Sequence, residues 1–397
     1  MKRVVVTGLG FVSSLGLDAK TTWAGMLEGR SGIRPLRHFA TPREAIQIAA
    51  EVDLPEDAPP TRHTSRCERL AMLALEEALR QAGLDLDSGD PRRRGVFHAS
   101  TAAGMPVAEA YILARQAGER GKATEPLYQH CSIITDRVAE RIQAMGPRST
   151  VMNACSSSLT TIAQAWERLA IGELDFAVAG GADVLCHTTF GGFSSLKAMD
   201  PNPCRPFSVD RAGLNLGEGA VQLVLEPLDL AQARGAEILG EVVGYGASSD
   251  AHHPTAPHPE GIGAARAMDM ALQVGRLHAE EVDLISAHGT ATPANDGVEC
   301  LAIHRVLGSA ARGVSVTSSK SQFGHTLGAA GALATAVALL ALRDQVVSPT
   351  LRLDQPDPAC DMDCTPLIPR ERKLRAALVN AFAFGGNNMC LALRRWE

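Results

Sequence analysis

The sequence is poor in aromatic residues, which make up 4% of its 397 residues. Its net charge of −6 at pH 7 gives no electrostatic reason to bind nucleic acid or an anionic membrane. Proteins that stack nucleic-acid bases rely on aromatic side chains, so no nucleic-acid partner is expected. With 45% hydrophobic and 21% charged residues, the composition is that of an ordinary globular protein with an ample core.

The sequence also lacks a hydrophobic run long enough to cross a membrane. Its longest apolar stretch, Leu327 to Leu342, is rich in alanine and glycine and is shorter than the roughly 20 residues that a bilayer requires. The basic and apolar start, Met1 to Val6, has no small-residue cleavage site of a signal peptide. We therefore expect no membrane span and interpret the start as a buried strand followed by a turn.

Neither a disulfide framework nor a metal site is indicated. The nine cysteines are odd in number and scattered, which is typical of reduced thiols in a cytoplasmic protein. Only Cys360 and Cys364 lie close together, and no second pair accompanies them. The histidines of a polar loop are likewise interpreted without a metal: His252, His253 and His258.

What the sequence does contain is an alternation of predicted strands and helices. Ser65 with Glu68 predicts a capped helix that ends at Gly83. A turn is predicted at Gly8-Leu9-Gly10, which lacks the third glycine of a dinucleotide-binding fingerprint. Residues 35–60 are predicted as a long loop. Further strands are predicted at 95–102, 174–182, 220–226, 238–245, 282–287, 314–318 and 378–381, and further helices at 261–274, 294–307 and 327–345. The alternation predicts an α/β fold with two halves of similar order, residues 1–236 and 237–397.

The candidate nucleophile lies between Val151 and Gly172. Apolar residues recur there at steps of three and four and predict an amphipathic helix that begins at Cys155. A helix N-terminus offers unpaired N–H groups and the positive end of the helix dipole, which both favour a thiolate. The residues alone leave two interpretations of Cys155, a reactive thiol or a small buried hydrophobe.

Three further segments place polar residues between glycines, directly after predicted strands. They are Ser286-Ala287-His288-Gly289-Thr290-Ala291-Thr292-Pro293, Ser318-Ser319-Lys320-Ser321-Gln322-Phe323-Gly324-His325 and Asn380-Ala381-Phe382-Ala383-Phe384-Gly385-Gly386-Asn387-Asn388. Open α/β sheets bind their ligands at such strand ends. One cysteine and two histidines form the set needed for thiol-based acyl transfer.

Longer motifs run from Val4 to the end of the chain: Val-Thr-Gly-Leu-Gly, Asn-Ala-Cys-Ser-Ser-Ser, Cys-Arg-Pro-Phe-Ser, Leu-Gly-Glu-Gly-Ala, His-Gly-Thr-Ala-Thr-Pro, Ser-Lys-Ser-x-x-Gly-His and Phe-Gly-Gly-Asn-Asn. In combination they resemble the β-ketoacyl-[acyl-carrier-protein] synthases of the thiolase-like superfamily. The resemblance implies a five-layered α-β-α-β-α fold with two duplicated halves. It also implies an enzyme that joins an acyl group to malonyl units by decarboxylative Claisen condensation.

By this resemblance, Cys155 takes the acyl group from the phosphopantetheine thioester of an acyl carrier protein. His288 and His325 promote decarboxylation of the malonyl carrier protein and bind the developing enolate. Lys320 matches the lysine that supports the histidines, and a nearby cation would help to keep them neutral. The backbone N–H groups of Cys155 and Phe384 match the oxyanion hole.

The remaining matches concern the acyl and pantetheine sites. Phe384, with Phe382, matches the gate to the acyl pocket, and Ala383 stands between them where glycine is usual. Positions that contact the pantetheine arm are matched by Thr290, Thr292 and Thr255. A supporting acidic residue is matched by Glu299. No metal or organic cofactor bound by the protein is implied, since the pantetheine arrives on the carrier protein.

Alternatives stay open at this point. A coenzyme A-dependent thiolase uses a second reactive cysteine, whereas His325 with Lys320 fits the decarboxylating synthases better. His325 also argues against synthases with a Cys-His-Asn set. A non-catalytic chain-length factor usually lacks the nucleophile that Cys155 supplies, and a serine hydrolase would need Gly-x-Ser-x-Gly, which is missing.

The pathway and the partners are predicted from finer details. The segments Arg211 to Glu218 and Asp250 to His253 look closer to synthases of bacterial polyene and polyketide pathways, including aryl polyene clusters, whereas Phe384 matches the elongating synthases of fatty-acid synthesis. Both pathways stay open, with polyene or polyketide elongation slightly favoured. The resemblance implies an acyl carrier protein as partner. It also implies a homodimer, or a heterodimer with a chain-length factor, built across a strand near Ser149 to Met152.

Overall fold

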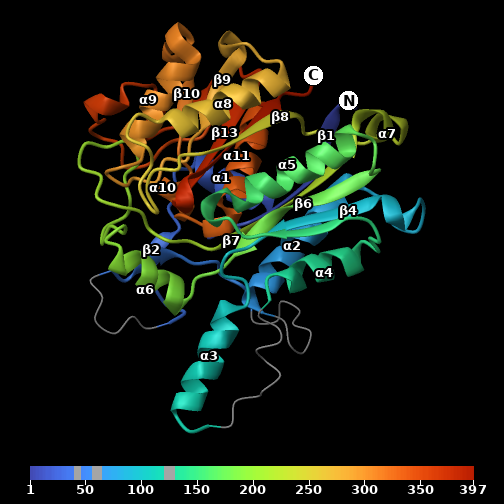
Figure 1. The fold of residues 1–397 in the computed structure, drawn as a ribbon, viewed down its shortest axis with the longest axis horizontal. Coiled ribbons are helices and arrows are strands. Elements are labelled where there is room, and N and C mark those ends of the chain that lie inside the picture. The colour runs from blue at the N-terminus through green and yellow to red at the C-terminus, as the bar shows by residue number, and fades with distance from the viewer. Residues whose placement is uncertain (40–45, 56–64, 120–129) are drawn as a thin grey trace.

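A computed structural model describes residues 1–39, 46–55, 65–119 and 130–397 (Figure 1). Its centre is a ten-stranded mixed sheet. The first half of the chain supplies β1 (Val4–Val12), β4 (Arg94–Ala99), β5 (Arg148–Val151), β6 (Phe176–Asp183) and β7 (Gly219–Pro227). The second half supplies β8 (Gly240–Ser249), β9 (Val282–Ser286), β10 (Ser315–Thr317), β13 (Ala376–Ala383) and β14 (Asn387–Arg394).

The two halves repeat one topology. The strand order is β5-β4-β6-β7-β1 in the first half and β10-β9-β13-β14-β8 in the second, which is 3-2-4-5-1 within each half. In both, the second strand pairs in parallel with the third and fourth, and the fifth pairs antiparallel with the fourth and first. The halves join where Val4–Val6 pairs with Gly240–Val242. The predicted duplication is confirmed, whereas the boundary near residue 236 stays a prediction.

Helices form the other three layers. Helices α5 (Ser157–Ala170) and α11 (Ala330–Asp344) pack on each other between the two half-sheets. The outer layers are α2 (Arg66–Ala82) with α4 (Ser132–Arg141) over the first half, and α8 (Ile262–Gly275) with α9 (Asp296–Leu307) over the second. The result is the predicted α-β-α-β-α arrangement.

The peripheral elements are mostly short. The helices are α1 (Ala19–Leu27), α3 (Met105–Gln116), α6 (His187–Ser195), α7 (Leu228–Ala233) and α10 (Lys320–Phe323). Two small antiparallel sheets pair β2 (Ile33–Pro35) with β3 (Ile48–Ala50) and β11 (Val346–Val347) with β12 (Arg370–Glu371). Three single 3₁₀ turns border the cavity described below: η3 (Ala154–Ser156), η6 (Leu327–Ala329) and η8 (Phe384–Gly386).

Gly8 and Gly10 lie inside β1 and not in a turn after it, so this prediction is wrong. A Cβ atom at Gly10 would lie 1.7 Å from the carbonyl oxygen of Ala74 in α2, and one at Gly8 would lie 2.2 Å from that of Ala78. The glycines therefore allow α2 to pack directly on the strand. The predicted cap of α2 is confirmed, because the Ser65 side chain accepts the N–H of Glu68 at 3.1 Å.

Five strands of the described part of the chain were not predicted: β2, β3, β11, β12 and β14. β3 lies within the predicted loop 35–60, of which residues 40–45 and 56–60 lie outside the described part of the chain. β14 follows the Gly-Gly-Asn-Asn segment and forms an antiparallel hairpin with β13.

The exclusion of a membrane span by length alone is wrong, because the stretch Leu327–Asp344 is long and apolar enough to cross a membrane by length and composition. However, 89% of this window is buried inside the protein. Its apolar character is therefore explained by its place as the inner helix between the half-sheets.

Candidate active site

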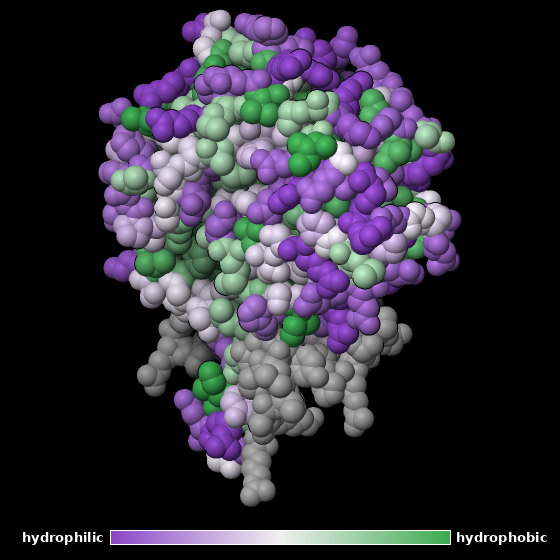
Figure 2. Space-filling view, turned by 45° about the vertical axis from the view of Figure 1, so that its right-hand side comes forward, coloured by the Kyte–Doolittle hydropathy of each residue, from purple (hydrophilic) through white to green (hydrophobic). Residues whose placement is uncertain are grey.

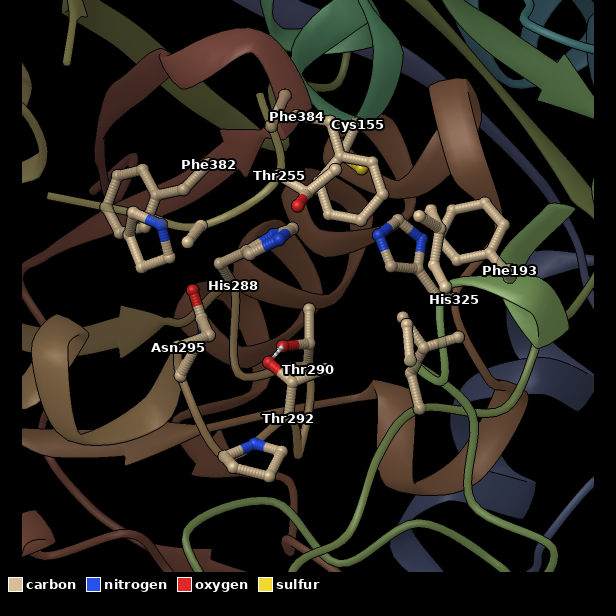
Figure 3. Close-up of a pocket in the computed structure, with 18 of the residues that line it drawn as sticks. Cys155, Phe193, Thr255, His288, Thr290, Thr292, Asn295, His325, Phe382 and Phe384 are labelled. Carbon is tan, nitrogen blue, oxygen red and sulfur yellow. Dashed lines mark hydrogen bonds between the residues drawn. The ribbon is translucent and has the colours of Figure 1, made fainter. Parts of the chain in front are cut away.

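A cavity of about 270 Å³ lies where the loops after β9 and β13 meet the N-terminus of α5 (Figure 3). Parallel strands that end at one edge of a sheet bring their following loops together there. The cavity collects most of the residues predicted from the sequence: Cys155, His288, His325, Phe382, Phe384, Thr255, Thr290 and Thr292. Lys320 and Glu299 do not line it and are buried in the surrounding protein.

Cys155 lies in η3, directly before α5, and is 6% exposed. The helix itself begins at Ser157, slightly later than predicted. Ala154, the residue before the cysteine, has a φ of +55°, which is unfavourable for a residue with a Cβ atom and costs about 1–3 kcal/mol. Such conformations concentrate at functional sites because the surrounding structure has to enforce them.

Burial raises the pKa of Cys155 to about 11, so its resting side chain is a thiol. The Lys320 ammonium and the backbone N–H groups of Phe384 and Cys155 act in the opposite direction. The N–H groups at the helix start thus favour the thiolate, as expected, but desolvation of the sulfur outweighs their effect. The contact of the Phe384 N–H with the sulfur agrees with the position expected of an oxyanion-hole donor.

The two histidines face the cysteine. The Cys155 sulfur and one nitrogen from each imidazole all lie within 4.8 Å of one another. The rings of His288 and His325 have centroids 5.5 Å apart and planes at 84°. The Nδ1 atom of His325 accepts the N–H of Leu327 at 3.0 Å, so the proton of the neutral ring is on Nε2. Within the described part of the chain, Nδ1 of His288 has no hydrogen-bond partner.

Both imidazoles are neutral at rest. Burial lowers the pKa of His288 and His325 well below the usual value, and the Lys320 charge lowers both further. The expected influence of Lys320 is thus confirmed, although burial is the larger cause. Lys320 itself is 4% exposed, so it is not a solvated surface charge. Its positive charge also disfavours a divalent cation on the neighbouring Cys-His-His set.

Helix α9 fixes the loop that carries His288. The Glu299 carboxylate accepts the N–H groups of His288 and Gly289, both at 2.8 Å, and the Asn380 amide at 3.0 Å. One turn earlier, Asp296 accepts the N–H of Ala291 at 3.1 Å. Both carboxyl groups are buried, so they orient the loop and not the substrate.

The two phenylalanines after β13 occupy different places. The ring of Phe384 stacks on Phe193 of α6, with centroids 5.6 Å apart and planes at 24°. The ring of Phe382 is buried and lies 6.0 Å from that of His288. The structure therefore places Phe382 beside His288, whereas Phe384 forms a pair with Phe193.

The three threonines line the cavity but differ in exposure, since Thr290 is buried and Thr292 is half-buried. Thr290 and Thr292 share a hydrogen bond of 2.9 Å between their hydroxyl oxygens, and Thr255 is exposed (Figure 3). The lining also contains residues that were not predicted from the sequence: Phe193, Leu196, Lys197, Asp250 and Asn295. Phe193 lies in α6 and Lys197 just after it, in a segment whose sequence has no apolar period typical of a helix.

Family models cover nearly the whole chain. The model "Beta-ketoacyl synthase, N-terminal domain" matches residues 1–231, and "Beta-ketoacyl synthase, C-terminal domain" matches residues 239–354. The chain belongs to the β-ketoacyl synthase family. The resemblance inferred from the motifs and the thiolase-like fold are thereby confirmed.

Relatives from two kinds of bacteria match over the full length. The synthase is 36% identical to "3-oxoacyl-[acyl-carrier-protein] synthase 2" of Staphylococcus aureus (strain COL), covering 100% of this chain and 99% of that protein. It is 40% identical to "Nodulation protein E" of Rhizobium meliloti (strain 1021), covering 99% of both chains. The chain is thus an elongating β-ketoacyl synthase, an acyltransferase.

Solved structures of similar proteins include partners. The ishigamide ketosynthase/chain length factor has a TM-score of 0.95 and 34% identity, with full coverage of both chains. A type II polyketide synthase ketosynthase, solved with its acyl-carrier protein, has a TM-score of 0.93 and 30% identity, again with full coverage. The first of these structures thus contains a chain length factor, and the second contains an acyl-carrier protein.

Proposed function

We propose that Cys155 carries the growing acyl chain and that His288 and His325 drive its extension by a malonyl carrier protein. The observation that carries this proposal is the buried Cys-His-His group, whose reacting atoms lie within 4.8 Å of one another. The pantetheine arm of the carrier enters past the exposed Thr255 and lies along Thr290 and Thr292, which also line the cavity. The protein itself needs no bound cofactor in this scheme.

Acylation begins from the thiol. The Cys155 sulfur attacks the thioester carbonyl, and its proton passes to the neutral imidazole of His288, whose Nδ1 is not bound by any described residue. The backbone N–H groups of Cys155 and Phe384 bind the oxyanion. When the pantetheine sulfur leaves, it takes that proton, so His288 returns to its neutral form.

Condensation then uses the malonyl thioester. The bond to its carboxylate breaks, CO₂ leaves, and the electron pair moves into an enolate whose oxygen accepts the Nε2–H of His325. The enolate carbon attacks the acyl carbonyl on Cys155 and forms the new carbon–carbon bond. The carbon–sulfur bond to the cysteine then breaks, and the β-ketoacyl chain leaves on the carrier. The released Cys155 thiolate takes up a proton from solvent and regains its resting thiol form. Burial and the Lys320 charge keep both histidines neutral, and Glu299 holds the backbone of His288 in place.

The pathway we infer is polyene or polyketide extension, in the cytoplasm, with an acyl carrier protein as partner. The similarity to the ishigamide and type II polyketide ketosynthases supports this pathway. The second chain of a dimer, a copy of this chain or a chain-length factor, would pair with β5. This edge strand is partly exposed, and Met152 beside it is 60% exposed.

Intact mass measurement tests the function. The purified protein is exposed to saturated and polyunsaturated acyl carrier proteins, with Cys155→Ala as control. We expect an acyl adduct that the control lacks, and a preference for polyunsaturated chains. A preference for saturated chains would contradict the pathway. No adduct with any chain would favour the alternative of a non-catalytic chain-length-factor subunit.

A further inference from the structure

Helix α3 projects from the body of the protein, and none of its residues is buried (Figure 1). It carries two exposed apolar side chains, Ile112 at 52% and Leu113 at 56% exposure. Its Glu109 side chain turns back to the body. The Glu109 carboxylate accepts the N–H of His187 at 3.0 Å and that of Thr188 at 2.6 Å, which are the first two residues of α6.

These bonds act together with Phe39, whose ring meets those of His187 and Phe190 with centroids 4.5 Å and 5.7 Å apart. The first N–H groups of a helix have no partner within the helix and need acceptors from outside. The capping residue, Cys186, offers only a sulfur, which lies 3.5 Å from the N–H of Thr189. Phe190 is the one buried residue of α6. A carboxylate at this end also interacts favourably with the helix dipole.

The other end of α6 reaches the acyl site. Phe193 lies in its last turn, lines the cavity and stacks on Phe384 (Figure 3). A shift of α6 therefore moves the aromatic partner of the residue assigned to the gate. The other end of this connection is α3, whose residues are all at least partly exposed in the part of the molecule that projects from the body (Figure 2).

We propose that Glu109 is a positioning residue that sets acyl-chain selection by holding α6, and thus Phe193, against Phe384. The inference rests on the proposed synthase function and on the role of Phe384 as gate to the acyl pocket, which the family resemblance implies. It makes chain selection depend on α3, a helix that contributes no residue to the cavity lining.

The test compares Glu109→Gln with Glu119→Gln, a matched change at an exposed glutamate beyond the same helix. Glutamine keeps the shape but turns one acceptor oxygen into a donor that faces an N–H group. We measure the rate of Cys155 acylation for a short and a long acyl chain on the carrier protein. The ratio of the two rates should change by about three- to tenfold in Glu109→Gln and stay unchanged in Glu119→Gln.

Three companion measurements separate positioning from damage. Phe193→Leu should change the same ratio, and the double variant should change it no further, because both substitutions act through one contact. Malonyl decarboxylation, which uses His288 and His325, should stay within about twofold. Glu109→Asp, which keeps the charge on a shorter side chain, should restore part of the ratio and covers the case that Glu109→Gln does not fold.

Phe384→Ala distinguishes the two levels of the proposal. If it changes the ratio while Glu109→Gln and Glu109→Asp do not, Glu109 has no influence on the gate and the inference is wrong. If Phe384→Ala leaves the ratio unchanged, the gate role itself is wrong and the inference falls with it. An equal loss of acylation for both chains and of decarboxylation would show general damage and would also overturn it.

Discussion

Replacing Asp183 by asparagine should destabilise the protein and impair one catalytic step more than the other. Asp183 ends β6, is fully buried, and meets only donors. Its Oδ1 accepts the Ser100 hydroxyl at 2.8 Å and the N–H of Ala102 at 2.7 Å, and its Oδ2 accepts the Thr101 hydroxyl and the N–H of Gly328, both at 2.7 Å. Asparagine can keep only one of these two acceptor oxygens.

The size of the effect follows from the donors that are left. Whichever way the amide turns, its NH₂ group faces a buried backbone N–H that has lost its acceptor, and a hydroxyl that has to turn away. A buried donor without a partner costs about 1–3 kcal/mol, so we expect a loss of roughly 2–5 kcal/mol in the free energy of unfolding. Gly328 follows Leu327, whose N–H sets the His325 tautomer, so malonyl decarboxylation should fall more than acylation of Cys155.

Urea unfolding measures the first effect, and Asp175→Asn is the matched control. Asp175 pairs with Arg93 at the surface, where both side chains are 39% exposed, so its replacement should cost about 1 kcal/mol or less. A similarly small loss for Asp183→Asn would refute the reasoning. It would mean that burial, which raises the pKa of Asp183, already keeps this carboxyl protonated and able to donate.

Three further predictions test other parts of the molecule. His325→Ala should keep acylation of Cys155 but lose malonyl decarboxylation, measured as CO₂ release; if both survive, the assigned role is wrong. Burial lowers the pKa of His98 to about 3. Below about pH 6.5, His98 therefore binds a proton in the unfolded chain but stays neutral in the native state. His98→Gln should therefore recover about 2 kcal/mol of the stability lost between about pH 7 and 5 in urea unfolding, and an unchanged loss would contradict this. Gly10→Ala, with its Cβ against the Ala74 carbonyl, should lower stability by about 1–3 kcal/mol or more in thermal melting, whereas Gly313→Ala, with open space, should not.

The sequence predicts those parts of the fold and site that depend on local pattern. The segments around His288, Lys320 and Phe384 could be placed at strand ends because glycines and polar residues follow short apolar runs there. The inner helix 330–344 was predicted from its alanine-rich apolar run. Neither prediction needed knowledge of which strands are neighbours.

Properties that depend on tertiary burial were not predictable in this way. The helix start suggests an acidic thiol at Cys155, but the second half of the chain covers the sulfur and raises its pKa. Helix α6 buries only Phe190, so no apolar period marks it, and Phe193 acquires its role only by meeting Phe384 from the other half. β14 was not predicted because it begins with two polar residues, Asn387 and Asn388, which continue the glycine-rich segment of the site directly into the strand.

The duplicated topology explains why the reactive groups meet. Cys155 precedes α5 and His325 precedes α11, and these helices follow the third strand of their own half. Because the two inner helices pack on each other with η3 against η6, both N-terminal ends point to the cavity. Each end favours negative charge, yet burial keeps the resting thiol protonated and both imidazoles neutral. The stabilisation is therefore reserved for the oxyanion and the enolate, charges that exist only during the reaction, which is where it lowers the barrier.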